Sequence, residues 1–205
     1  MAQPVVTSDF DKNRNKLKYG QAITVYGASA SGLDECFHEA ARRVGCEAVK
    51  KGVAVITGGG TQGMMGTVND TVLGAGGIAI GIIPAFMVER GWGHKGLSHI
   101  EITENMHARK ALMAELSTGV IALPGGVGTL DELMEIITWR QLGLYEGNVV
   151  ILNTDGYWDD LLSMLNTAEK RGFMRKGVSE DKLWHVTDNP EEAVRLAVAV
   201  KTGQA

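Results

Sequence analysis

The sequence is poor in cysteine, proline and aromatic residues, with 2 Cys, 4 Pro and 6% aromatics in 205 residues. Cys36 and Cys46 fall within one predicted helix, which puts their Cα atoms about 15 Å apart. A disulfide needs a separation below about 7 Å, so both thiols are expected to be free. Free thiols fit a reducing compartment, and we expect a cytoplasmic protein. Residues 1–19 lack the apolar core of a secretory leader and are expected to form an N-terminal arm.

Neither strong charge nor a long uninterrupted apolar run is present. With 20 Lys and Arg against 24 Asp and Glu, the net charge is −4, which gives no positive field for a nucleic-acid partner. The segment Val72–Val88 has no charged side chain, but four glycines interrupt it and Pro84 follows its most apolar part. This pattern predicts a helix end, a turn and a buried strand, so we expect no membrane association.

Glycine is the residue in excess. The chain has 27 glycines, about 13% of its residues and roughly twice the usual ~7%. They are clustered rather than periodic, which predicts loops where the backbone approaches another group closely. The hydrophobic fraction of 44% is that of a globular chain, and the length suits one α/β domain, which we place at residues 20–205.

Short apolar runs alternate with longer segments of helical periodicity. Nearly continuous apolar runs are typical of strands covered on both faces, and the alternation predicts a Rossmann-like, doubly wound parallel sheet with helices on both faces. The predicted strands are Ala22–Tyr26, Val53–Thr57, Ile78–Ile83, Val120–Leu123, Val149–Asn153 and a weaker Leu183–Val186. The predicted helices are Leu33–Lys51, Met64–Gly74, Met106–Ser117, Leu130–Leu142, Trp158–Arg171 and Pro190–Val200. The polar segment Glu89–Asn105 is predicted to be a surface loop with a short strand at His99–Ile102.

Three glycine-rich turns follow the first, second and fourth predicted strands, and they should meet at one edge of the sheet. The turn Gly27–Gly32 lacks the Lys and Ser or Thr of a nucleoside-triphosphate loop. The turn beginning at Gly58 matches the dinucleotide fingerprint formally. However, it follows the second strand, and the region of the next strand, where the ribose acid is expected, has no acid until Glu89, which disfavours a dinucleotide oxidoreductase. Together the turns indicate a ligand that carries a phosphate.

The third turn, Pro124–Glu132, is the most informative. Its glycines precede a predicted helix, and a helix N-terminus with free N–H groups is a ready anion site. Glu132 would stand one turn into that helix. The same residues admit a second interpretation, because Thr129 and Glu132 have the spacing of a capping box with no chemical role.

Arg109 and Lys110 lie near the start of another predicted helix, where the helix dipole disfavours cations. This position indicates an anionic group nearby, and the alternative is a solvated basic pair. The five histidines have no metal-binding spacing, so we expect no metal.

These motifs, taken in order, resemble the Lonely Guy family. The segments that carry the resemblance are Gly58–Gly66, Met106–Lys110, Pro124–Glu132 and Ile137–Gly143. The resemblance implies a Rossmann-like homodimer that hydrolyses the N-glycosidic bond of a nucleoside 5′-monophosphate, AMP or a cytokinin riboside 5′-monophosphate. The products would be the free base and ribose 5-phosphate, and no cofactor is implied.

The resemblance also implies site residues. Arg109 and Glu132 would be the catalytic pair. The implied substrate-binding residues are Ser29, Gly59, Gly60, Glu89, Lys110, Gly125, Gly126, Val127, Gly128, Thr129, Leu130, Asp131 and Thr138. The loop after Pro84 is about two residues longer than in the family, so Glu89 matches its acidic contact only approximately. Asp131 stands where many members have glutamate, and these departures bear on base specificity.

Two other functions would use parts of the same sequence. A pyridoxal-phosphate decarboxylase would need a Schiff-base lysine, for which Lys110 is the only candidate. A non-catalytic nucleotide or molybdenum-cofactor carrier would bind a similar ligand without turnover.

The predicted helix Leu130–Leu142 is apolar nearly all round, which indicates either deep burial or a two-fold interface. The resemblance favours the interface.

Overall fold

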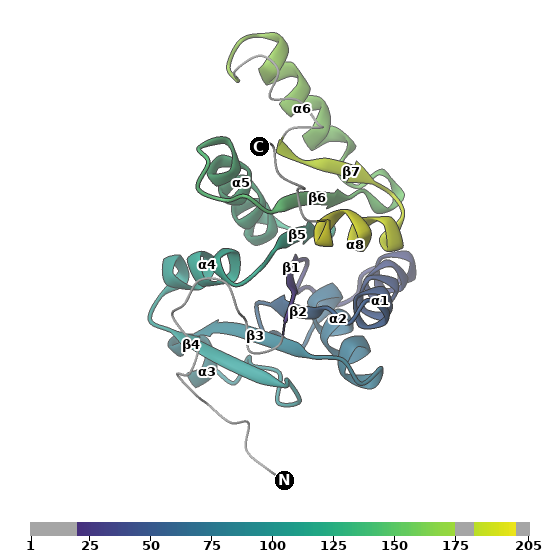
Figure 1. The fold of residues 1–205 in the computed structure, drawn as a ribbon, viewed down its shortest axis with the longest axis vertical. Coiled ribbons are helices and arrows are strands. Elements are labelled where there is room, and N and C mark those ends of the chain that lie inside the picture. Colours follow the sequence, from purple (N-terminus) through teal and green to yellow (C-terminus); the bar gives the residue numbers. More distant parts are fainter. Residues whose placement is uncertain (1–19, 175–182, 200–205) are drawn as a thin grey trace.

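A computed structural model describes residues 20–174 and 183–199. Its centre is a seven-stranded, wholly parallel sheet in the order β4-β3-β2-β1-β5-β6-β7 (Figure 1). The strands are β1 Ala22–Tyr26, β2 Ala54–Thr57, β3 Ala79–Pro84, β4 His99–Thr103, β5 Gly119–Ala122, β6 Asn148–Leu152 and β7 His185–Thr187. The prediction of a Rossmann-like parallel sheet is confirmed.

Helices cover both faces of this sheet. They are α1 Glu35–Lys50, α2 Gly63–Gly74, α3 Ala85–Glu89, α4 Met106–Glu115, α5 Val127–Gln141, α6 Asp159–Lys170 and α8 Pro190–Val198. Side chains of α1, α2 and α8 pack in one core cluster, and those of α4, α5 and α6 pack in the other (Figure 1). The alternation of side chains along β1 shows why its sequence is apolar throughout. Ile23 and Val25 face the first cluster, whereas Ala22 and Tyr26 face the second.

The order of the strands reverses between β1 and β5. From β1 the chain builds outward to β4, and then it returns to pair β5 with the other side of β1, with Tyr26 opposite Ala122. In open sheets of this kind, ligands bind outside the carboxyl ends of the strands at such a reversal. The loops that follow β1 and β5 therefore flank the expected binding position.

Several expected boundaries need correction. The segment expected to be a loop after Pro84 begins with the short helix α3, which five residues are too few to reveal by periodicity. Helix α5 begins at Val127, three residues before the expected Leu130. Strand β7 begins at His185 rather than Leu183. The arm predicted at residues 1–19 lies outside the described residues.

Two further expectations concern single features. Cys36 and Cys46 are both free and exposed on α1, as their spacing predicted. Among residues 20–174 and 183–199, no helix has the length and apolarity needed to cross a bilayer.

Candidate active site at the carboxyl edge of the sheet

The three glycine-rich loops meet at the carboxyl edge, as predicted from their positions after strands. The N–H of Ala28, in the first loop, donates to the carbonyl of Pro124 in the third at 3.0 Å. The carbonyl of Ala28 accepts from the N–H of Met65, just after the second loop, at 3.2 Å. The backbone of the first loop therefore holds the other two at fixed positions on either side of it.

The third loop leads directly into α5. The N-cap of α5 is Gly126, in an extended conformation. The amides of the first turn, from Val127 onward, have no acceptor within the helix and form its positive end. The capping-box interpretation is wrong, because the helix starts earlier than expected and Thr129 lies inside its first turn. Glu132 is therefore free of a capping role and stands in the second turn, about 7.5 Å along the axis from Val127.

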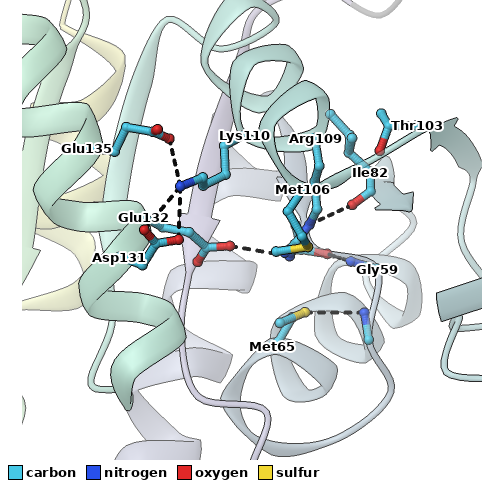
Figure 2. A network of polar contacts seen from close by, with 12 residues as sticks. Gly59, Met65, Ile82, Thr103, Met106, Arg109, Lys110, Asp131, Glu132 and Glu135 are labelled. Carbon is cyan, nitrogen blue, oxygen red and sulfur yellow. Dashed lines mark hydrogen bonds and ion pairs between the residues drawn. The ribbon is translucent and has the colours of Figure 1, made fainter. Parts of the chain in front are cut away.

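Glu132 faces Arg109 of α4. The Oε1 atom of Glu132 lies 3.3 Å from Nη2 of Arg109, and their side chains are only 9% and 7% exposed (Figure 2). The Nε of Arg109 also donates to the carbonyl of Ile82 at 3.1 Å, and Nη1 lies 3.8 Å from Sδ of Met106. The interpretation of Arg109 as a solvated cation is therefore wrong. Its guanidinium is held in a buried position against a buried carboxylate.

Burial dominates the electrostatics of Glu132. Removal from water raises the pKa of this carboxyl above its usual value, and the Arg109 guanidinium opposes the rise without cancelling it. Tyr26, at the end of β1, is buried on the same side of the sheet. Burial raises the pKa of its phenol well above the usual value, and the charge of Glu132 adds to this rise. The site thus combines a carboxylate of raised basicity with a fixed cation.

Lys110 is also buried, which overturns the solvated-pair interpretation for this residue too. Its Nζ lies 2.9 Å from Asp131 Oδ2 and 3.1 Å from Glu135 Oε2, two carboxylates one turn apart on α5 (Figure 2). Burial lowers the pKa of Lys110, but the hydrogen bonds that its ammonium donates to these carboxylates outweigh that effect and the net pKa is raised. Lys110 therefore stays protonated, and its ion pairs connect α4 to α5.

The remaining predicted residues lie on the glycine loops, on α5 and at the end of α3. Ser29 is exposed on the first loop, Gly59 is buried and Gly60 is half-buried. Thr138 is exposed on α5, where its hydroxyl donates to the carbonyl of Met134 at 2.8 Å. Glu89 is exposed at the end of α3, and no hydrogen bond or ion pair found among the described residues joins it to Arg109 or Glu132.

One contact to the third loop was not predicted. The hydroxyl of Tyr157, between β6 and α6, donates to the carbonyl of Gly125 at 2.9 Å. The Tyr157 ring also packs edge-on against Phe37 and Trp158. The two bonded residues are 32 positions apart, and no local pattern in the sequence connects them.

The outer face of α5 lines an open groove of about 570 Å³. Its lining residues are Val127, Leu130, Asp131, Met134, Glu135, Thr138 and Trp139. Leu130, Met134 and Trp139 are only partly buried, and Val127 is 86% exposed. The interpretation that the apolar helix is buried on all sides within one chain is wrong for this face.

Comparisons with known proteins identify relatives of this chain. The family described as possible lysine decarboxylase matches residues 65–197. A probable cytokinin riboside 5′-monophosphate phosphoribohydrolase of Oryza sativa subsp. japonica is 40% identical over 75% of this chain and 69% of its own length. A second rice enzyme of that name is 41% identical over 74% and 63% of the two chains. A cytokinin riboside 5′-monophosphate phosphoribohydrolase of Arabidopsis thaliana is 39% identical over 80% and 76%.

Solved structures share the fold at lower identity. The molybdenum cofactor carrier protein of Chlamydomonas reinhardtii superposes with a TM-score of 0.66 at 20% identity, over 85% of this chain and 94% of that one. The molybdenum cofactor binding protein of Rippkaea orientalis gives 0.65 at 23% identity, over 86% and 94%. At these identities the likeness bears on the fold alone.

Proposed function

The chain belongs to the possible lysine decarboxylase, or Lonely Guy, family, and from that premise we propose that it is a nucleoside 5′-monophosphate phosphoribohydrolase. Its substrate would be AMP or a cytokinin riboside 5′-monophosphate, as the names of its relatives suggest. The observation that carries the proposal is a buried carboxylate, Glu132, held by Arg109 in the second turn of a helix whose amide-lined start faces the glycine loops. We propose a cytoplasmic location, as the free thiols suggest.

The arrangement suits cleavage of an N-glycosidic bond. The phosphate would bind the free amides from Gly126 to Thr129, and this remote contact would fix the ribose against Glu132. As the C1′–N bond breaks, its electron pair leaves with the base and positive charge develops on the ribose ring. The carboxylate of Glu132 stabilises that charge and removes a proton from the water that attacks C1′. The base takes up a proton, so that the products are free base and ribose 5-phosphate.

Arg109 has two parts in this scheme. Its ion pair fixes the direction of the Glu132 carboxylate, and its contacts among the described residues use three of its five N–H groups. The other N–H groups can bind the substrate. Lys110, held by Asp131 and Glu135, contributes positive charge beside the start of α5.

Chromatography of the products tests the proposal directly. The purified protein is incubated with AMP, adenosine or a cytokinin riboside 5′-monophosphate, and free base is quantified. Release of base from the nucleotides with little release from adenosine is the expected result, because the phosphate supplies the binding energy that places the ribose. Binding of AMP without any release of base would instead favour a carrier.

The family's descriptive name suggests a different chemistry, and the state of Lys110 weighs against it. A Schiff base requires a neutral amine, whereas the two carboxylates that bind Lys110 raise its pKa and keep it protonated. The carrier alternative is favoured only by solved structures below 25% identity, which bear on the fold alone.

The pH dependence of turnover should report the state of Glu132. Because burial raises the pKa of this group above its usual 4.5, kcat should fall as the pH is lowered through a value above 4.5. The measurement is kcat at saturating AMP between pH 4 and pH 8, since saturation removes the effect on binding of the substrate phosphate, whose own pKa is about 6. A profile that stays flat down to pH 4 would contradict the assignment of Glu132 as the base.

We also propose that the groove along α5 is the interface of a homodimer. Leu130, Met134 and Trp139 leave an apolar strip beside the candidate site, and a second copy is the partner that the family membership favours. Met134→Asp would bury a charge in that interface and is expected to shift the protein to monomers in sedimentation equilibrium. Val88→Asp, at an exposed apolar position on α3, is the control and should stay dimeric. A parent chain that sediments as a monomer would refute the interface.

A further inference from the structure

The second glycine loop, Gly58–Gly60, forms one wall of the slot that holds Arg109. A methyl group at Gly58 would overlap Nη2 of Arg109, so the backbone and the guanidinium are in direct contact. Gly59 has φ +74° and packs against Gly81 of β3. Figure 2 shows Gly59 beside the end of the Arg109 side chain. The path of this loop therefore sets how far the guanidinium can reach toward Glu132.

Two fully buried polar residues outside the predicted site hold the loop. The N–H of Gly59 donates to Oγ1 of Thr57 at 3.1 Å. The Thr57 hydroxyl donates to Oδ1 of Asn69 on α2 at 3.0 Å, and Nδ2 of Asn69 donates to the carbonyl of Gly60 at 3.1 Å. The Thr57 hydroxyl accepts one hydrogen bond and donates another, so the Asn69 atom facing it must be the amide oxygen and the atom facing Gly60 the amide nitrogen.

The burial of these two side chains makes the network stiff. Thr57 and Asn69 are both 0% exposed, and Asn69 lies on the helix face that otherwise buries Met64, Val68 and Val72. An amide in such a place is costly unless its hydrogen bonds are made, and water cannot replace a lost partner. The helical hydrogen bonds of α2 are made by its backbone, without the Asn69 side chain. The Asn69 amide is therefore available to bond to Thr57 and to the glycine loop.

We propose that Thr57 and Asn69 are positioning residues for Arg109, acting through the second glycine loop. They touch neither the guanidinium nor the carboxylate, and they fix the backbone against which Arg109 lies. That Arg109 acts on a nucleotide rests on the proposed function, whereas the mechanical link from Asn69 to Arg109 does not.

Asn69→Leu is the test, because leucine fills a similar volume without either hydrogen bond. The matched control is Asn148→Leu. Asn148 is also buried and its Nδ2 donates to two carbonyls, of Leu196 and Ala199, but it begins β6 at the opposite edge of the sheet. We expect kcat for AMP to fall on the order of 10²-fold in Asn69→Leu, since small misplacements of catalytic groups have effects of that size. Asn148→Leu should lower the Tm about as much as Asn69→Leu does, because each variant loses the two hydrogen bonds of a buried amide. It should retain kcat.

A second readout does not depend on activity. The Nε–H of Arg109, which donates to Ile82, gives a ¹⁵N-detected NMR signal that Arg109→Lys identifies by its loss. Asn69→Leu should shift this signal and speed its exchange with water, and Asn148→Leu should leave it unchanged. Thr57→Val, which breaks the same network, should shift it in the same direction.

The outcomes separate the two claims. If the parent releases no base from AMP, the proposed function fails and the NMR signal alone decides the positioning role. If Asn69→Leu loses no more kcat than Asn148→Leu, or leaves the Arg109 signal in place, the positioning role is refuted.

Discussion

Glu132→Gln is expected to lower kcat for AMP by about 10³-fold, within the range that a positioned general base contributes. The amide keeps the shape of the side chain and an oxygen that can accept from Arg109, but it can neither remove a proton from water nor balance charge on the ribose. Product chromatography under single-turnover conditions measures the loss. Since the phosphate site is untouched, the Kd for AMP should change little.

The stability of the same variant should move in the opposite direction. A carboxyl whose pKa is raised by folding binds its proton more tightly in the folded chain, so the free energy of unfolding falls as the pH rises from about 4.5 through the folded pKa. At pH 7 the parent bears this cost, and the neutral glutamine does not. We expect Glu132→Gln to have a Tm equal to or above that of the parent at pH 7, with the difference lost near pH 4. Thermal unfolding at the two pH values measures it.

Glu135→Gln is the matched control. Glu135 lies three residues beyond Glu132 on the same helix, but its carboxylate binds Lys110 instead of Arg109. Its replacement should weaken the tie between α4 and α5 and leave most of kcat. If Glu132→Gln released adenine at the parent rate, or lost no more than Glu135→Gln, Glu132 would not be the base.

The sequence predicts the strands well because a strand that is covered on both faces is apolar at nearly every position. The predicted run Ala22–Tyr26 is β1 with no error, since both of its faces are covered. The start of α5 is different. Gly126 and Gly128 add no apolar side chain at the start of this helix, so its apolar periodicity begins only at Leu130. That turn provides the amides of the proposed phosphate site, so the missed boundary lies at the candidate site and not in the core.

The candidate site also combines residues that the sequence indicates with contacts that it does not. The sequence indicates Arg109 because a cation near the start of a helix is poorly placed, and it indicates Glu132 because that residue follows a glycine loop. Their contact, across 23 residues of sequence, depends on the reversal of strand order between β1 and β5. Nothing local predicts it. Asn69 could have been noticed as a lone amide among apolar helix positions, but its partners in the second glycine loop follow only from the packing of α2 on β2.

Gly58→Ala should give the second large effect, because the new methyl group would occupy the space of Arg109 Nη2. Gly58 does not have a positive φ, so alanine can adopt its backbone conformation and the guanidinium is the group that must move. We expect kcat to fall by about 10²-fold with a small change in Tm. Gly74→Ala, with no atom within 4 Å of its new methyl group, is the control and should retain kcat.

The pKa of Glu132 should show whether Gly58→Ala acts by moving Arg109. The Arg109 guanidinium lowers the pKa of Glu132 against the effect of burial, more than Lys110 does, so moving it away should raise that pKa further. The acid limb of the kcat profile in Gly58→Ala should therefore lie at higher pH than in the parent. Arg109→Ala should lose activity by itself, and adding Gly58→Ala to it should cost nothing more, because the methyl group then has no guanidinium to displace. Additive losses would mean that Gly58 acts on the loop and not through Arg109.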